Sequence, residues 1–544
     1  MRNLILIAWI LFLSACQSKT KADLIIHNAS IYTVDSSFNI VEAMAIKDGK
    51  IIATGKSQEI LTTYDATEKF DAGGKFIYPG LIDAHAHFFN YGFSLQTAKL
   101  EGTKSWEEIL EKLKDFAATN KQGWITGRGW DQNDWEVKEF PSKENLDSLF
   151  PDRPVLITRI DGHAAIANQK ALDLAGVKPG RKLTGGEVET KNGKLTGILV
   201  DNAVDIVSDK IPGPDASSST KALLEAQANC FASGLTTVDD CGLSFNAVEF
   251  ISAVQKTGKL KMRIYAMLSD AKENYNYLFA KGKIKTDRLN VRSFKVYADG
   301  ALGSRGACLL EPYSDKPNWR GFLLSNPEHF DSVANIIAAK DMQMCTHAIG
   351  DSANRAILKI YGKYLKGKND KRWRIEHAQV INKNDFNLFS EYSIIPSVQP
   401  THGTSDMYWA GDRLGAERVK GAYAFRELLE QNGWIPLGTD FPVEDISPLK
   451  TFYAATARKD SKGWPESGFQ KENALTREQA LRGMTIWAAK SNFEENEKGS
   501  LEKNKFADFI ILDKDLMKIP ENDILSTKVL YTFLNGEKVF QKNN

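Results

Sequence analysis

The feature that most constrains the fold is a series of eight short apolar segments with strand character, separated by helical patterns. Strands that alternate with helices in this way indicate βα units and a parallel sheet. Eight such units fit a closed (β/α)8 barrel, whose active site lies at the carboxyl ends of the strands. The predicted strands are 76–87, 235–241, 261–268, 291–299, 343–349, 372–379, 394–400 and 434–440.

Other parts of the chain are predicted to surround this barrel, which takes residues 76–494. About 150 residues separate the first two strands, far more than one helix needs, so residues 121–205 are expected to form an inserted subdomain. Residues 23–75 and 495–544 carry short strands and Asx-Gly turns, and neither piece is long enough to bury a core alone. The expected fold is therefore α/β: a TIM-like (β/α)8 barrel, a small β-sandwich built from both chain ends, and an insert after barrel strand 1.

The N-terminus has the features of a targeting segment. Arg2 precedes an apolar run from Leu4 to Leu13, which is too short to span a bilayer but typical of a signal peptide. The sequence Leu13-Ser14-Ala15-Cys16 resembles a bacterial lipobox, so residues 1–15 are predicted to be removed and Cys16 to carry lipid. Residues 16–22 would then tether the protein to a membrane of the bacterial cell envelope, on the periplasmic side, and Gln17 is compatible with outer-membrane sorting. The alternative is an ordinary secretory signal.

Composition excludes several classes of partner. The formal net charge is +1, so nothing predicts nucleic acid or a strongly acidic surface as partner. The four cysteines after Cys16 include no Cys-x-x-Cys pair and do not suggest a disulfide framework. A small-molecule substrate is the expected partner besides the membrane, and the sequence leaves open a homo-oligomer.

Chemistry-bearing residues stand where the predicted strands end. His85 and His87 close the first strand, and because strand side chains alternate faces they can reach one point, as metal ligands do. Taken alone, the pair is equally well explained as two solvated histidines in a turn. The later strands decide in favour of a metal. Strand four carries a lysine inside an apolar run, which is costly to bury alone, and strands five, six and eight end in polar ligand types. These residues are Lys295, His347, His377 and Asp440.

This ordered set resembles the metal-dependent amidohydrolase superfamily: His-x-His on strand one, Lys on four, His on five and six, and Asp on eight. The phrase Pro-Gly-Leu-Ile-Asp-Ala-His-Ala-His at 79–87 is part of the resemblance. The insert, the stretch 295–305 and the sequence His-Ala-Ile-Gly-Asp at 347–351 resemble a narrower branch, amidohydrolase family 3, which includes N-substituted formamide deformylases and YtcJ-like proteins.

The resemblance implies a role for each ligand. His85 and His87 would hold the more buried metal, and His347 and His377 the second. Lys295, as its carbamate, would bridge the two, and Asp440 would touch the first metal and accept a proton as catalytic base. Imidazole and carboxylate ligands suit Zn²⁺ and similar divalent ions. If Lys295 is instead an ordinary salt-bridged lysine, the site holds one metal.

The function that follows is hydrolysis of a C–N bond other than a peptide bond in a protein, such as an amide, a formamide or an N-acyl amine. A deaminase or isomerase on the same barrel is the first alternative, although no glutamate follows His347 at the His-x-x-Glu spacing common among amidohydrolase deaminases. A non-catalytic binding protein is the second, and the complete ligand set argues against it.

Further residues are candidates for binding substrate. One group lies in the insert, and the other lies after strand four or at the end of strand seven. Arg128, Trp130 and Asp131 could line the pocket, although packing within the insert explains these three slightly better. The predicted substrate-binding residues are His163, Trp130, Asp131, Asp299, Arg305 and Gln399.

Overall fold

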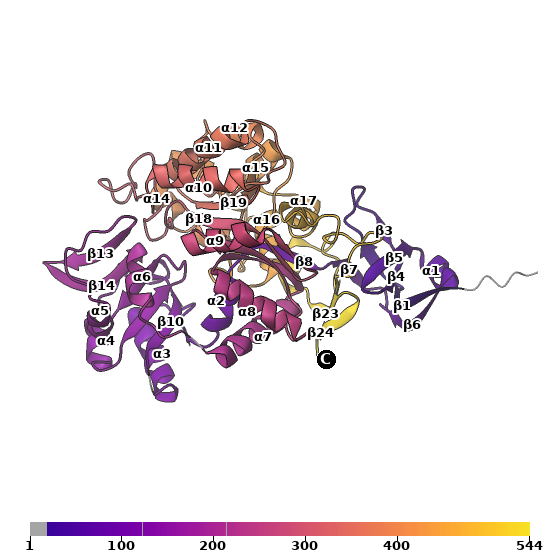
Figure 1. Cartoon of the computed structure of the whole chain (residues 1–544), viewed down its shortest axis with the longest axis horizontal. Helices are drawn as coiled ribbons and strands as arrows, with labels where there is room; N and C mark the ends of the chain where they lie inside the picture. The colour runs from indigo at the N-terminus through magenta and orange to yellow at the C-terminus, as the bar shows by residue number, and fades with distance from the viewer. Residues whose placement is uncertain (1–18, 122, 214, 544) are drawn as a thin grey trace, which may run out of the picture.

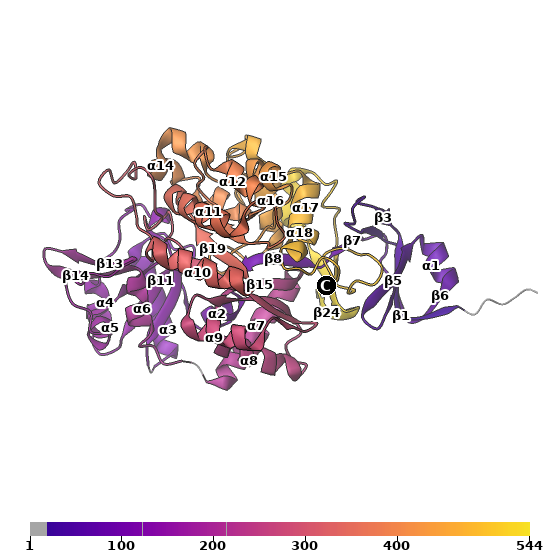
Figure 2. The same cartoon turned by 45° about the horizontal axis from the view of Figure 1, so that its top comes forward.

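The computed structural model describes residues 19–121, 123–213 and 215–543. Its centre is a parallel barrel, which lies between two smaller β-rich units in both views (Figures 1 and 2). Seven strands pair in parallel in barrel order. They are β8 (Leu81–Ala86), β15 (Leu235–Leu243), β16 (Arg263–Ser269), β18 (Leu289–Tyr297), β19 (Gln343–Ala348), β20 (Arg374–His377) and β21 (Ile395–Ser397).

The eighth side of the barrel is closed by an extended segment, where a regular strand was predicted over 434–440. Leu437 makes a single parallel bridge to Val398, next to β21. On the other side, the Ala84 amide of β8 donates to the Leu437 carbonyl at 3.2 Å. The segment therefore completes the ring without a continuous ladder, and it carries Asp440 to the end of the barrel where β8 also ends.

Helices cover the outside of the barrel, as expected for parallel strands whose two faces are both buried. The apolar faces of these helices and the outer faces of the strands form one large buried cluster. The helices between or after the barrel strands are α7 (Ala216–Ala232), α8 (Phe245–Lys256), α9 (Lys272–Lys281), α10 (Pro327–Ala339), α11 (Asp351–Leu365), α12 (Phe386–Glu391), α13 (Pro400–Asp406), α14 (Ala410–Arg418), α15 (Phe425–Asn432), α16 (Pro448–Ala457), α17 (Arg477–Gly483) and α18 (Ile486–Ser491).

Both ends of the chain contribute to the second unit. One sheet joins N-terminal and C-terminal strands in the order β24 (Glu537–Gln541), β23 (Val529–Leu534), β22 (Phe509–Leu512), β7 (Phe76–Pro79), β2 (Ser30–Tyr32) and β3 (Ile40–Val41). The other has the order β5 (Lys50–Gly55), β4 (Ala43–Lys47), β1 (Thr20–His27) and β6 (Tyr64–Asp71). Apolar residues of the two sheets share one buried cluster, so the sheets pack face to face as a sandwich.

The predicted first strand, 76–87, is in fact two strands in two different sheets. β7 belongs to the sandwich and β8 to the barrel, and Gly80 lies between them. The amide of Gly80 donates to the Asp508 carbonyl, and a β-carbon at this position would collide with the side chain of Thr236. Glycine therefore lets the chain pass from one sheet into the other at a point where neighbouring backbone is close.

The third unit is the insert between β8 and β15, which forms its own six-stranded sheet at the end of the molecule opposite the sandwich (Figure 1). Its first strand, β9, precedes the predicted start at residue 121. The strands are β13 (Gly186–Lys191), β14 (Lys194–Asp201), β12 (Ala164–Ala167), β11 (Val155–Arg159), β10 (Ile125–Trp130) and β9 (Ala98–Lys99). The helices of this region are α2 (Phe88–Ser94), α3 (Trp106–Thr119), α4 (Glu144–Leu149), α5 (Gln169–Leu174) and α6 (Asn202–Ser208).

The described residues include no helix that is both long and apolar enough to cross a membrane. The predicted signal peptide and Cys16 lie outside the described residues.

Candidate metal centre

His85 and His87 lie at the end of β8, and each ring is fixed through its Nδ1 atom. The Nδ1 of His85 is 2.6 Å from Oε2 of Glu376 on β20, and that of His87 is 3.0 Å from the Cys241 carbonyl at the end of β15. Because these acceptors take the Nδ1 proton, the Nε2 atom of each ring is left as a free electron-pair donor. Carboxylate and carbonyl partners orient metal-binding histidines in this manner.

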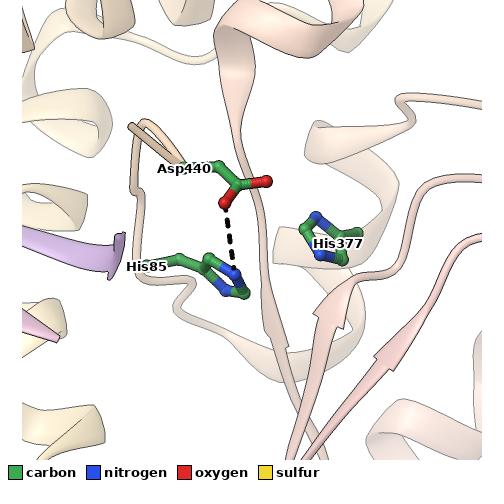
Figure 3. A group of neighbouring side chains, drawn as sticks. All are labelled: His85, His377 and Asp440. Atoms are coloured by element: carbon green, nitrogen blue, oxygen red, sulfur yellow. Dashed lines mark ion pairs between the residues drawn. The ribbon is translucent and has the colours of Figure 1, made fainter. Parts of the chain in front are cut away.

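Asp440 and His377 approach the same point from the other side of the barrel. The Oδ1 atom of Asp440 lies 3.6 Å from Nε2 of His85 and 3.2 Å from Nε2 of His87. One ligand atom each from His85, His377 and Asp440 lies within 4.8 Å of the others, and Figure 3 shows these three side chains around a common space.

The backbone at two of these ligands is held in the left-handed region. His377 has φ 73° and Asp440 has φ 64°, which is uncommon for residues with a β-carbon and is costly unless the surroundings enforce it. At His377 this turn follows directly after Glu376. It allows Glu376 to hold His85 while His377, held through Nδ1 by Gln399 Oε1 at 2.7 Å, joins the cluster itself.

Lys295 and His347 complete the six predicted ligands. Lys295 is fully buried on β18, with Nζ 3.1 Å from Nε2 of His85, and it makes no ion pair with a carboxylate among the residues described. His347 on β19 lies with its ring centre 4.6 Å from that of His377. All six side chains therefore come together at the carboxyl end of the barrel, from β8, β18, β19, β20 and the closing segment.

The donor set fits divalent metal ions. Nε2 of His347 and Oδ1 of Asp440 are buried with no hydrogen-bond partner, as expected of atoms reserved for a ligand. Burial lowers the pKa of His85 to about 4 and lowers the pKa values of His347 and His377 well below 6.5. The three rings are therefore neutral near pH 7, which is the form that binds a metal. Nitrogen and oxygen donors of this kind suit zinc and similar ions.

A cavity of about 1110 Å³ opens above these ligands. Its floor includes His87, Lys295, His347, His377 and Asp440 of the barrel. One wall comes from the insert, which contributes Arg128, Asp131, Arg159, Asp161, His163 and Asp201. The insert thus forms one side of the space in which a small molecule would meet the metal ligands.

Two of the predicted substrate-binding residues line this cavity. His163 projects from the insert, with Nδ1 2.6 Å from Oδ1 of Asp201 and its ring centre 5.0 Å from that of His347. Asp131 lines the cavity while paired with Arg159.

The other four do not line it. Trp130 is fully buried in the core of the insert and donates to the Ile157 carbonyl. Asp299 is buried and accepts from the backbone amides of Cys308, Ile349 and Gly350, so it orders the loops after β18 and β19. Arg305 pairs with Asp315 beside a separate, smaller hollow. Gln399 supports His377.

Sequence reasoning missed three supporting residues. Glu376 was visible as the neighbour of His377, but alternation of strand faces predicts that adjacent residues point apart. His402 lies on α13, after the seventh strand rather than at its end, and its Nε2 lies 3.3 Å from Oδ2 of Asp440 and its Nδ1 3.0 Å from Glu444. Asp201 gave no signal, because its partner His163 is far from it along the chain.

A parallel barrel with a histidine and aspartate cluster at the carboxyl ends of its strands is the architecture of metal-dependent hydrolases. The family model described as "Amidohydrolase family" matches residues 68–540, so the chain belongs to this family and is a metal-dependent hydrolase of the amidohydrolase superfamily.

Three curated relatives align over nearly the whole chain. Protein LONG AFTER FAR-RED 3 of Arabidopsis thaliana is 32% identical over 95% of this chain and 92% of its own length. The putative amidohydrolase YtcJ of Bacillus subtilis is 30% identical over 95% and 99%. N-substituted formamide deformylase of Arthrobacter pascens is 24% identical over 94% and 97%.

Solved structures show the same fold. An uncharacterised metal-dependent hydrolase of Pyrococcus horikoshii superposes with a TM-score of 0.75 at 28% identity, covering 92% of this chain and 99% of that one. An adenosine deaminase of Xanthomonas campestris with bound zinc superposes with a TM-score of 0.54 at 12% identity, covering 96% and 93%, which is a likeness of fold alone.

Proposed function

We propose that this protein hydrolyses a C–N bond in a small-molecule amide, such as an N-formyl or N-acyl amine. The observation that carries the proposal is the cluster of His85, His377 and Asp440, which stands with Lys295 and His347 on the floor of a large cavity. The similarity to an N-substituted formamide deformylase and to a putative amidohydrolase over almost the full chain supports an amide substrate.

The ligands divide into two groups. His85, His87 and Asp440 would hold one metal, and His347 and His377 a second, with Lys295 as a carbamate between them. Carbamylation would replace the buried ammonium of Lys295 by an oxygen ligand, which removes the cost of burying an unpaired cation. A divalent ion held here would supply a Lewis acid that polarises a carbonyl and makes water easier to deprotonate.

Asp440 is the residue placed to move the proton. Burial alone would raise its pKa, but His85, together with hydrogen-bonding His402 and His87, outweighs burial and holds the pKa well below 3.8. The carboxylate is therefore ionised at neutral pH and can accept a proton from the attacking water and deliver it to the amine nitrogen that leaves. His402 fixes Oδ2 and so orients the other oxygen toward the ligands.

His163 is suited to hold the substrate from above. Asp201 fixes its Nδ1 atom, which leaves Nε2 on the side of the ring that faces the cavity near His347. In this position it would bind the carbonyl oxygen of the amide and keep the reacting carbon over the floor of the site.

A deaminase is the alternative reaction on the same barrel. The position that follows His347 by three residues is Gly350, and the next carboxylate, Asp351, is buried and accepts from the Leu310 amide. A second carboxylate for deamination is therefore not supplied by this loop, and amide hydrolysis is the better supported reaction.

The test is a hydrolysis screen of the purified protein with N-formyl and N-acyl amines, together with a metal analysis. We expect amine release that is lost after treatment with a chelator and restored by added Zn²⁺. Full activity in metal-free protein would contradict the proposal, as would ammonia release from aminated heterocycles with no amide cleavage.

For location, we infer a lipid anchor at Cys16 that holds the enzyme in the bacterial cell envelope. The inference is supported by the charged, apolar and Leu-Ser-Ala-Cys order of the first residues.

A further inference from the structure

Arg128 is a cation on the wall of the cavity that lacks an anion to pair with. It lies on β10 of the insert, and its Nη2 atom donates to the Ile160 carbonyl at 2.8 Å. Its Nε atom is buried with no hydrogen-bond partner, and within the described part of the chain no carboxylate lies within ion-pair distance of the guanidinium. Partly buried arginines without an anion are unusual, because desolvating the charge is costly unless it is compensated.

The charge of a neighbouring arginine on the same wall, Arg159, is compensated by carboxylates. Arg159 pairs with both Asp131 and Asp161, and these two carboxylates raise the pKa of its guanidinium in spite of burial. Burial lowers the pKa of Arg128, and the more distant charges of Asp161 and Asp440 do not offset it. Asp161 is already paired with Arg159, and Asp440 and Glu101 lie beyond ion-pair distance of the guanidinium, so Arg128 is left facing the cavity without a paired anion.

The same loop positions Arg128 and His163. It runs over residues 159–163, offers the Ile160 carbonyl to Arg128, and then turns at Gly162, whose φ is +78°. A β-carbon at Gly162 would lie 3.3 Å from Nη1 of Arg128, so glycine gives the guanidinium its space. His163 follows directly and faces His347. One loop thus sets an unpaired cation and a candidate carbonyl-binding residue on the same side of the cavity.

We propose that Arg128 binds a carboxylate of the substrate, so that the preferred substrates are anionic amides such as N-acyl or N-formyl amino acids. This inference rests on the proposed amide hydrolysis. The amide would lie over the metal ligands and below His163, while the carboxylate reaches the guanidinium. Arginine suits this task because its planar donors match the two oxygens of a carboxylate.

The other positively charged residues of the cavity are not available to bind a substrate carboxylate. Of its lysines and arginines, Lys295 belongs to the metal ligands and Arg159 is doubly paired. Acidic residues also line the cavity: Asp201 contacts His163 and Glu444 contacts His402, whereas Glu101 and Asp205 make no ion pair among the described residues. Arg128 is therefore the group on which discrimination for a negative charge would depend.

The test compares three substrates that differ in the carboxylate: N-acetylphenylalanine, N-acetylphenethylamine, which lacks it, and N-succinylphenethylamine, which carries it on the acyl side. We expect the wild-type protein to favour one of the carboxylates over the neutral amide by about 10- to 100-fold in kcat/KM, the size of a charge-assisted hydrogen bond. Arg128→Met should abolish this preference, measured as the ratio of kcat/KM for the carboxylate to kcat/KM for the neutral amide, and Arg128→Lys should restore part of it.

Controls separate this inference from the proposed reaction. Lys194→Met, at an exposed position of the insert, should leave kcat/KM unchanged for all three compounds, and thermal denaturation of each variant checks the fold. Calorimetric binding of the same three compounds to metal-loaded protein gives a readout that needs no turnover. Hydrolysis without any dependence on Arg128 would overturn the anion site alone. Arg128-dependent binding of a carboxylate without hydrolysis would overturn the proposed reaction alone. The absence of both binding of a carboxylate and preference for one would overturn the anion site.

Discussion

The Nδ1 atom of His85 lies 2.6 Å from Oε2 of Glu376, although the two residues are far apart in the sequence and on strands that do not pair with each other. This contact fixes the ring of a fully buried candidate metal ligand, and Glu376 itself is fully buried. His85 holds the pKa of Glu376 down to about 2 although burial alone would raise it, so its carboxylate stays ionised.

Glu376→Gln should therefore weaken metal binding. The amide retains the size of the side chain but loses the charge that makes His85 a strong donor, and partners of this kind are worth about 10- to 100-fold in metal affinity or activity. Metal retention against a competing chelator is the measurement. Glu391→Gln, at an exposed position on α12, is the matched control and should retain wild-type affinity. Equal affinity in the Glu376 variant would show that this contact has no role in the site.

Asp440→Asn should lower kcat by about 10²- to 10⁴-fold, because it removes the group that accepts the proton. Asp440 is also a candidate metal ligand, so activity must be expressed per bound metal in protein reconstituted to wild-type content. A variant that is fully loaded and retains near wild-type kcat would assign the proton transfer to another group, with His402 as the first one to examine.

Lys295→Met tests the bridging carbamate. If the bridge exists, wild-type protein carries two metal ions per chain, and the variant carries one or none because methionine offers no oxygen. Elemental analysis after gel filtration gives the count, with Lys194→Met as the exposed control. One metal per chain in the wild-type protein, unchanged in the variant, would favour a single-metal site and an ordinary lysine.

The buried carboxyl group of Asp240 should make the stability of the protein depend on pH. It is buried and accepts the Phe89 amide, and burial raises its pKa from 3.8 to about 8. Between about pH 4 and 8 the carboxyl group of Asp240 is therefore protonated in the folded state but ionised in the unfolded state. The free energy of unfolding decreases as the pH rises through this window.

In Asp240→Asn the side chain cannot ionise. The free energy of unfolding of the variant relative to wild type should increase from pH 4 to pH 8, by an amount of the order of a few kcal/mol. Urea denaturation across the pH range measures this difference. A difference that stays constant with pH would mean that Asp240 is ionised in the folded protein throughout.

Cys16→Ser should release the protein from the membrane fraction of a host that processes lipoproteins, because the thiol that would carry lipid is absent. Ultracentrifugation and labelling with a radioactive fatty acid check this, and Cys308→Ser is a matched control since Cys308 lies far along the chain. Unchanged membrane association of the Cys16 variant would contradict the anchor.

The barrel, and the meeting of the six candidate ligands at one end of it, could be predicted from sequence because both follow local rules. Alternating strands and helices specify the architecture, and side chains at strand ends meet at one rim. Lys295, His347 and Asp440 could be placed at this rim by the same rule, without knowledge of contacts between distant segments.

The remaining features depend on tertiary contacts. The change of sheet at Gly80 depends on Thr236 and Asp508, and the pairing of Glu376 with His85 depends on a left-handed residue that strand alternation does not predict. Trp130 looked like a pocket residue because it neighbours Asp131, but it packs inward with Phe140 in the core of the insert. His402 lies on a helix after β21, and its role becomes visible only when Asp440 is placed beside it.

The pairing of β7 with β22 can form only after almost the whole chain has been synthesised. β7 leaves the ribosome early and leads through Gly80 directly into β8, but its antiparallel partner, which joins Ile77 to Ile511, is synthesised only near the end of the chain. Until then β7 has an open edge that favours unwanted pairing. A nascent chain released before residue 509 would therefore leave β7, which leads into the strand that carries His85, without its antiparallel partner.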